Sequence, residues 1–345
     1  MAAVRPYRIG IVGAASLLGK ELGEALADSA LANSDIVLLD AEDAAGRLSS
    51  SGEEVSFIQK LDADAMSGLD IVFFAGDAQT TRTYSTVARQ ANSSVIDLTY
   101  ALETEPETIL RGLWGGLLPQ TVQPDLTTPA VVSAHPAALM LALVTRRLRQ
   151  QFRIRMVAAT FFEPASEHGQ AGMDELHQQT VSLLSFQSLP REQYDAQIAF
   201  NLLPALGDAG KVKLAAVRQR ILDHYQKVAG AEAVPVNVQV IQAPVFHGYT
   251  AMLYVDLQEP ATVAEFESAA QGDRIDLVGA ESDPPSNLSA AGQQDLLLQV
   301  RPAGAGGTQT DFAVWIAADN LKVAAANAIA CAHELKRLRP QGSVQ

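Results

Sequence analysis

A two-domain α/β fold is predicted by three observations in this sequence. The chain has 345 residues, which is long for a single domain. Residues 7–98 alternate short apolar runs with segments of helical periodicity, at the spacing of strand–helix–strand units. From residue 152 onwards, strand patterns occur in succession and are separated by helices, which indicates a mixed or antiparallel sheet with helices on one face.

The first domain is expected to contain a mostly parallel sheet with right-handed crossovers. Strands are predicted at residues 7–12, 36–40, 71–75 and 94–98, and helices at 17–29 and 81–91. The run from Ile71 to Ala75 is apolar throughout, as expected of a parallel strand that is buried on both faces.

The second domain follows a strong helix predicted at 137–151. Its strands are predicted at 152–162, 236–245, 249–257, 295–300 and 311–316, and its helices at 173–185, 209–228 and 261–269. A last helix is expected at 319–338, with Asp319 as its N-cap. We therefore divide the chain into residues 1–132, joined by the C-terminal helix 319–338, and residues 133–318.

Composition excludes several classes of partner. The net charge of −14 argues against nucleic acid, because phosphate would be repelled. One cysteine, Cys331, allows neither an internal disulfide nor a thiolate metal cluster. The most apolar stretch, 130–144, is too short to span a membrane and is predicted to be a buried helix. With no leader pattern at Met1, we expect a cytoplasmic protein without a metal site.

A glycine-rich turn lies between the first strand and the first helix. Glycines there permit a tight turn and close approach of the backbone to a pyrophosphate, which the helix N-terminus attracts. The pattern predicts a Rossmann domain whose cofactor contacts come from Gly13, Ala14, Ser16, Leu17, Leu18 and Gly19. Ser16 occupies the middle glycine position, so its Cβ narrows the space for phosphate, and binding is expected to be either weak or lost.

The choice of cofactor depends on the end of the second strand. Asp40 is placed to accept a hydrogen bond from an NAD ribose hydroxyl. Residues 41–43, Ala-Glu-Asp, carry no positive charge for a 2′-phosphate, so NAD is favoured over NADP.

The motifs of this chain resemble those of the aspartate-β-semialdehyde dehydrogenase family, in the family's order and spacing. The resemblance covers residues 7–335. It rests on these segments: 13–19 (GAASLLG), 95–97 (VID), 163–169 (EPASEHG), 172–176 (GMDEL), 198–204 (IAFNLLP), 243–245 (APV), and 319–321 (DNL) with Asn327. It implies a Rossmann domain with an α+β dimerisation domain and a role in amino-acid biosynthesis. We place Ala75, Gly76 and Asn327 in the predicted cofactor site as well.

The family's reaction, as the resemblance implies it, is the reductive dephosphorylation of an acyl phosphate. It requires a thiolate nucleophile, a histidine acid/base, and arginines that hold anionic substrate. Here Pro136 falls on the cysteine, Tyr249 on the histidine and Gln242 on the substrate arginine. Glu103 falls on the phosphate-binding arginine and Glu163 on the substrate glutamine. No catalytic position is intact, and the sequence predicts a pseudoenzyme.

Several other polar residues have two interpretations each. His135 is either a displaced base or else an N-cap or a partly exposed loop residue. His247 is expected on the face of Tyr249, either near the cleft or as a structural histidine. Glu163, Glu167 and His168 form either a site for a cation or, as we favour, a solvated loop. Cys331 is expected to pack in the core, and Lys213 is a candidate for a retained substrate lysine. No catalytic or binding role is assigned to His177, His224 and His333.

Two functions are compatible with these residues. The first is a non-catalytic homodimer with a binding or interaction role, which could also pair with an active relative. The second is an oxidoreductase that acts on an aldehyde or oxo group with NAD or NADP by direct hydride transfer, with Tyr249 or His247 as acid/base. The sequence identifies neither the physiological ligand nor the partner.

Overall fold

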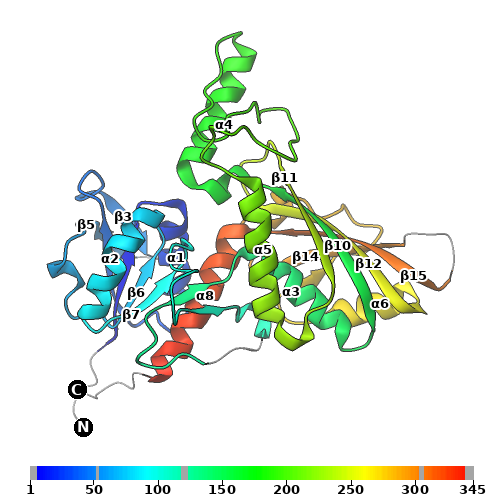
Figure 1. Cartoon of the computed structure of the whole chain (residues 1–345), viewed down its shortest axis with the longest axis horizontal. Helices are drawn as coiled ribbons and strands as arrows, with labels where there is room; N and C mark the ends of the chain where they lie inside the picture. Colours follow the sequence, from blue (N-terminus) through cyan, green and yellow to red (C-terminus); the bar gives the residue numbers. More distant parts are fainter. Residues whose placement is uncertain (1–5, 52–53, 118–122, 303–306, 339–345) are drawn as a thin grey trace. The chain divides into compact units, whose positions relative to one another are not determined.

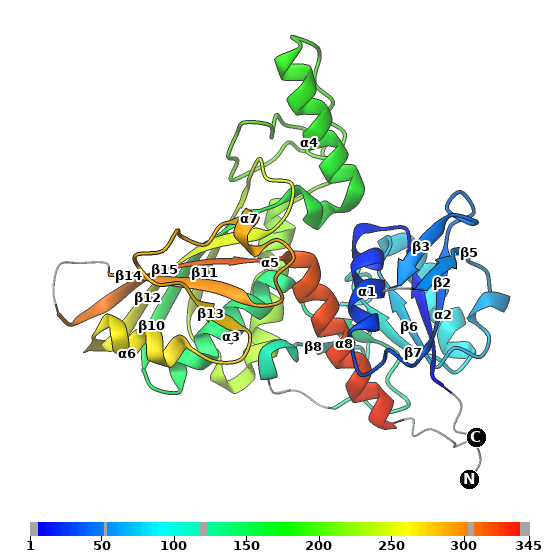
Figure 2. The ribbon, with the colours of Figure 1, turned by 180° about the vertical axis from the view of Figure 1, so that it is seen from behind.

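The computed structural model describes residues 6–51, 54–117, 123–302 and 307–338. The chain forms two compact units, residues 1–134 with 324–345 and residues 135–323. The first contains an all-parallel sheet and the second a mixed sheet (Figures 1 and 2), which confirms the predicted fold class.

The first unit has a seven-stranded parallel sheet in the order β5-β2-β1-β6-β7-β9-β8. Its strands are β1 (Arg8–Val12), β2 (Asp35–Asp40), β5 (Gln59–Lys60), β6 (Ile71–Phe74), β7 (Ser94–Asp97), β8 (Ile109–Arg111) and β9 (Val131–Ser133). Its helices are α1 (Leu17–Ala27), α2 (Ala78–Gln90) and the main part of α8 (Asn320–Leu338). Strand β3 (Leu48–Ser51) pairs antiparallel with β4 (Glu54–Phe57).

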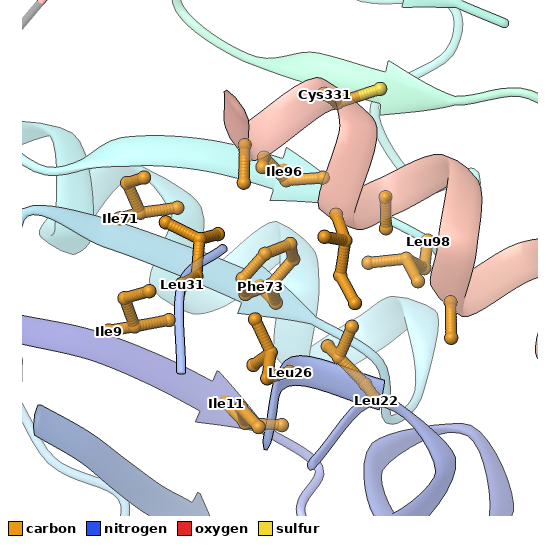
Figure 3. Close-up of a cluster of buried hydrophobic side chains, with 14 of the residues drawn as sticks. Ile9, Ile11, Leu22, Leu26, Leu31, Ile71, Phe73, Ile96, Leu98 and Cys331 are labelled. Atoms are coloured by element: carbon orange, nitrogen blue, oxygen red, sulfur yellow. The ribbon is translucent and has the colours of Figure 1, made fainter. Parts of the chain in front are cut away.

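Alternation along these strands produces two apolar cores, one on each face of the sheet. Ile9, Ile11 and Phe73 pack with α1 and α8 (Figure 3), while Val72 and Phe74 belong to the cluster that includes Ala88 of α2. Cys331 lies fully buried in the first core, which confirms its expected packing role, and burial raises the pKa of its thiol.

The second unit has a six-stranded sheet in the order β11-β10-β12-β15-β14-β13. The strands are β10 (Ile154–Glu163), β11 (Val236–Gln242), β12 (Tyr249–Ala261), β13 (Ile275–Leu277), β14 (Leu296–Pro302) and β15 (Gln309–Ala318). The helices are α3 (Pro136–Arg149), α4 (Gly169–Leu184), α5 (Leu214–Ala229), α6 (Val263–Ala270) and α7 (Asn287–Ala290). Helices α3, α5 and α6 pack on one face, and α4 projects away from the sheet (Figure 1).

Element boundaries differ from the predictions where local chemistry overrides periodicity. The helix expected at 209–228 begins at Leu214, because residues 207–210 form a turn in which Gly210 packs against the backbone of Tyr194. The strand expected to reach residue 245 ends at Gln242, before Pro244, which has no N–H to donate. Asp319 does cap α8, since its carboxylate accepts from the N–H groups of Leu321 and Lys322.

Candidate functional site

The glycine turn has the close backbone contacts that a dinucleotide fold requires. Gly13 has a φ of +84°, and a Cβ there would lie 2.3 Å from the backbone of Gly76. A Cβ on Gly19 would lie 2.1 Å from the carbonyl oxygen of Gly13. These contacts explain the glycines at positions 13, 19 and 76, and they place Ala75 and Gly76 beside the loop.

Ser16 does more in this loop than narrow it. Its hydroxyl accepts a hydrogen bond from the Gly19 N–H at 2.9 Å and donates one to the Ala75 carbonyl at 2.8 Å. Ser16 is therefore the N-cap of α1. The first N–H groups of a helix are the ones that bind a phosphate, and one of them is used here by a protein side chain.

The end of β2 brings together charges that the sequence separates. The Asp40 carboxylate accepts from the N–H groups of Ala15 and Ala41 at 2.7 and 2.8 Å. Lys60, on β5, is the register partner of Asp40, and its ammonium lies 3.0 Å from the Glu42 carboxylate. Sequence reasoning missed Lys60 because it lies 20 residues beyond Asp40 and is brought there only by strand pairing.

Asn327 is placed on the α8 side of the first unit, and its amide is fully engaged there. Its oxygen accepts from the N–H groups of Leu113 and Trp114, and its nitrogen donates to Arg111 O and Ser133 Oγ. The side chain is fully buried. This geometry gives Asn327 a tethering role between α8 and the loop after β8.

Helix α3 is capped by His135 and begins at Pro136. His135 is the N-cap, with its Nδ1 accepting from the Ala137 N–H at 3.2 Å, and Pro136 occupies the first helical position. The His135 backbone N–H donates to His224 Nδ1, and His135 Nε2 lies 3.2 Å from Glu167 Oε1. Both ring nitrogens of His135 are thus held, which favours the N-cap interpretation over a displaced base.

Gln242 and Tyr249 lie deep in the second unit. Gln242 ends β11 beside Glu163 of β10, and its amide nitrogen donates to the carbonyl oxygens of Glu163 and Ala243. The Tyr249 ring packs edge-on against Phe161 at 6.0 Å and lies 6.3 Å from the His135 ring. Both Gln242 and Tyr249 are fully buried.

Glu163, Glu167 and His168 form a buried ion-pair cluster, so the expectation of a solvated loop is wrong. Glu163 is fully buried, and its Oε1 lies 2.6 Å from His168 Nε2. Burial alone would lower the pKa of His168, but the Glu163 and Glu167 carboxylates raise it above its usual value. Burial raises the pKa of Glu167, but His135 and His168 offset this and hold it below the ordinary range. Each carboxylate is therefore paired with a histidine, Glu163 with His168 and Glu167 with His135.

His247 lies outside β12, so the strand alternation that would place it on the face of Tyr249 does not apply to it. β12 begins only at Tyr249, and Gly248 between the two has a φ of +84°, which turns the chain out of strand geometry. His247 is partly exposed, while Tyr249 is fully buried. Its Nε2 lies 2.9 Å from Asp319 Oδ2 and its Nδ1 3.2 Å from Ser166 Oγ.

The other candidate residues are dispersed. Glu103 lies near Asp97, whose pKa is raised by burial and by this second carboxylate. The Lys213 ammonium donates to the carbonyl oxygen of Asp208. In the part of the chain that the structure describes, there is no group of three His, Cys, Asp or Glu side chains suited to a metal ion. No helix among the described residues is long and apolar enough to cross a membrane.

Comparison with known proteins identifies the family. Residues 8–138 match the NAD binding domain of semialdehyde dehydrogenase, and residues 146–323 match its dimerisation domain. The chain belongs to the semialdehyde dehydrogenase family. Together the two matches cover every motif segment on which the sequence resemblance rests except Asn327, so the family assignment made from the motifs is confirmed.

Some relatives of this chain are named as enzymes and others are not. A USG-1 protein homolog of Pseudomonas aeruginosa is 30% identical over 332 residues, covering 94% of this chain and 96% of the relative. The aspartate-semialdehyde dehydrogenase of Rickettsia bellii is 26% identical and covers 96% and 98%. Among solved structures, a probable aspartate-semialdehyde dehydrogenase from Pseudomonas aeruginosa has a TM-score of 0.80 at 28% identity, covering 97% of this chain and all of that one. This semialdehyde dehydrogenase homologue therefore has the family fold over 97% of its chain.

Proposed function

We propose that this semialdehyde dehydrogenase homologue is a dimeric, nicotinamide-dinucleotide-binding protein that does not carry out the family's reductive dephosphorylation. The observation that carries the proposal is Pro136 at the first position of α3, where the family motif has its cysteine. A proline ring offers no nucleophile and no N–H. Loss of the nucleophile in catalytic triads costs roughly 10⁶ in rate.

The substrate side of the site supports the same proposal. The family pattern calls for a glutamine and an arginine where this chain has Glu163 and Gln242, and both are fully buried. Glu163 is paired with His168 at 2.6 Å. A buried carboxylate beside the substrate position would repel a dianionic acyl phosphate rather than hold it.

The first domain fits a dinucleotide in its backbone but presents a weakened phosphate site. Gly13, Gly19 and Gly76 preserve the close turn, whereas Ser16 takes the Gly19 N–H for itself. When bound, a nicotinamide cofactor would supply a hydride donor or acceptor. Asp40 and the backbone around Ala15 would hold its ribose and phosphates.

The charges beside Asp40 favour NAD over NADP. Lys60 is the nearest cation along β5, but its ammonium is neutralised by Glu42 at 3.0 Å. Glu42→Gln should therefore free Lys60 and strengthen NADPH binding relative to NADH, roughly two- to fivefold, because an exposed ion pair is worth at most about 1 kcal/mol. Asp43→Asn, at an exposed neighbouring carboxylate, is the matched control. If Glu42→Gln and Asp43→Asn have the same ratio of NADPH to NADH affinity, this account is contradicted.

The direct test of the proposal is an assay of the purified protein with aspartate semialdehyde, phosphate, and NAD or NADP. We expect no turnover above background, together with measurable quenching or enhancement of NADH fluorescence on titration with the protein. Turnover within an order of magnitude of a typical enzyme, near 10 s⁻¹, would refute the non-catalytic role.

The alternative oxidoreductase would use Tyr249 or His247 as acid/base. Full burial of Tyr249 disfavours it, whereas His247 is partly exposed and is oriented by Asp319. If the native protein shows no NADH binding at millimolar cofactor, this alternative is eliminated. If it binds NADH but does not turn over aldehydes, the binding role is favoured.

A further inference from the structure

Three side chains from distant parts of the second unit form a Ser–His–Asp series. Ser166 lies in the single turn η3 (Ala165–His168), His247 in the turn before β12, and Asp319 at the start of α8. Ser166 Oγ is 3.2 Å from His247 Nδ1, and His247 Nε2 is 2.9 Å from Asp319 Oδ2. These are the distances expected of a nucleophile, its base and the group that orients the base.

Asp319 determines which nitrogen of His247 carries the proton. Burial raises the pKa of Asp319, but hydrogen bonds from His247 and from the N–H groups of Gly292 and Lys322 hold it below the usual range. An ionised carboxylate only accepts hydrogen bonds, so His247 Nε2 must be the protonated nitrogen. The lone pair of Nδ1 is then directed at the Ser166 hydroxyl.

The Ser166 hydroxyl donates to Asn320 Oδ1 at 3.2 Å, and rotation about its Cβ–Oγ bond turns the same proton towards His247 Nδ1, which lies at the same distance. Asn320 Oδ1 already accepts from the Gly248 N–H, and the Asn320 amide nitrogen donates to Glu167 Oε2. The Ser166 N–H donates to the Phe246 carbonyl. The serine is thus fixed on its backbone side, and His247 Nδ1 is the basic acceptor within reach of its hydroxyl.

The surroundings restrict the substrate. Ser166 is 3% exposed, so an ester carbonyl reaches its Oγ only past His247, which is 28% exposed, and the adjacent Phe246, which is 41% exposed. The carboxylates of Glu167 and Asp319 lie beside the serine and its base and would repel an anion. An uncharged ester with a small apolar acyl group fits both conditions.

We propose that Ser166, His247 and Asp319 form a second, serine-based site that hydrolyses uncharged small acyl esters. Ser166 Oγ bonds to the ester carbonyl carbon while His247 Nδ1 takes the hydroxyl proton. The bond from that carbon to the leaving oxygen then breaks, and the leaving oxygen takes the proton from His247. Water, deprotonated by the same nitrogen, cleaves the acyl-serine to a carboxylic acid and restores the hydroxyl. No cofactor or oxidant takes part.

This activity goes beyond the proposed function and does not depend on it. His247 occupies a variable position of the family's Arg-Val-Pro-Val-x-x-x-His pattern, two residues before Tyr249. Ser166 and Asp319 match residues of the family motifs, so His247 is the group that this chain adds between them.

The first experiment uses the unaltered full chain and needs no variant. We expect phenylmethylsulfonyl fluoride to sulfonylate Ser166 with release of fluoride, located by mass spectrometry of the digested protein. We also expect 4-nitrophenyl acetate hydrolysis to be saturable and to be abolished in the labelled protein. Labelling spread over other serines and absent from Ser166 would overturn the proposal.

The second experiment compares variants for 4-nitrophenyl acetate hydrolysis. Ser166→Ala and His247→Gln should each lower the rate roughly 100-fold or more. The exposed Ser185→Ala and His177→Gln of the α4 region are matched controls and should leave the rate unchanged. Asp319 acts through His247, so Asp319→Asn should displace the pH profile of the remaining rate. A folded Ser166→Ala protein, with an unchanged melting temperature, that hydrolyses the ester at the original rate would overturn the proposal.

Discussion

At the scale of single residues, Ser16 and Glu163 have the same effect on two different parts of the molecule. The hydroxyl of Ser16 takes a helix N–H that a pyrophosphate would otherwise accept, and the Glu163 carboxylate is satisfied by His168 inside the protein. In each case a polar group that would face a ligand in the family pattern has an internal partner. When such groups bond to the protein itself, the fold keeps its hydrogen bonds satisfied while fewer groups are left to bind a ligand.

Ser16→Gly should strengthen NADH binding. The change frees the Gly19 N–H and removes the Cβ, while replacing an N-cap serine by glycine costs helix stability only a few tenths of a kcal/mol. One hydrogen bond to a charged phosphate is worth about 1.5–3 kcal/mol, so the dissociation constant should fall roughly tenfold or more. Titration of NADH with the protein, followed by nucleotide fluorescence, measures this dissociation constant. Ser29→Gly, at the other end of α1, is the control and should not alter it.

The His168 pair predicts how stability depends on pH. The folded-state pKa of His168 is raised above its unfolded value of about 6.5, so its stabilising contribution is complete below that pH. The contribution is lost as pH rises through the folded-state pKa. Denaturant midpoints of the native protein should therefore decrease with rising pH in this range, and those of His168→Gln should change less. Parallel slopes for the two proteins would contradict this role.

At the scale of elements, the regular periodicities were predictable and the positions set by tertiary pairing were not. The strands of residues 7–12 and 71–75 are apolar on both faces, and these were predicted almost to the residue because burial leaves a clear pattern. The two-residue strand β5 has no such pattern, so Lys60 could not be placed beside Asp40. Gly248 shows the converse, since its positive φ interrupts an alternation that the sequence suggested.

The candidate site was predictable in its members but not in its contacts. Glu163, Glu167, His135, His168, His247 and Tyr249 were all identified from the motifs. Their pairing into separate histidine–carboxylate contacts depends on the ends of β10 and β11 and on the turn at Gly248. Asp319 was expected only as a helix cap, and its second role with His247 requires the folded chain.

A buried ion pair adds to the contacts that hold helix α8 in the first unit. Arg111, at the end of β8, donates from Nε and a terminal nitrogen to the Glu334 carboxylate at 2.8 and 2.9 Å. Arg111 is 1% exposed, so removing the Glu334 carboxylate takes an ionised, bidentate acceptor away from a buried guanidinium. Glu334→Ala should lower the unfolding free energy of this unit by about 3 kcal/mol. The exposed Glu24→Ala is the control, expected within about 0.5 kcal/mol of the native protein in urea denaturation.

At the scale of the whole molecule, the open face of the second sheet predicts how two chains associate. Helices α3, α5 and α6 cover one face, while Met156, Met252 and Tyr254 remain exposed on the other. Met252 and Tyr254 lie two residues apart on β12 and so share a face, and Met252 pairs across strands with Thr160 and Trp315, which adds the partly exposed Trp315 to this apolar surface. An apolar face of this kind marks an association surface. The matched dimerisation-domain model covers the residues that build it.

Met252→Glu should therefore convert a homodimer into a monomer. A charge at the centre of an apolar interface would be buried without a partner, which costs several kcal/mol and in a two-fold dimer occurs on both chains. Analytical ultracentrifugation should give twice the chain mass of 36.7 kDa for the native protein and the chain mass for the variant. Leu126→Glu, at an exposed leucine of the first unit, is the matched control and should remain dimeric. A native protein that sediments as a monomer at micromolar concentration would rule out the dimer, whereas a dimeric Met252→Glu protein would place the interface on another surface.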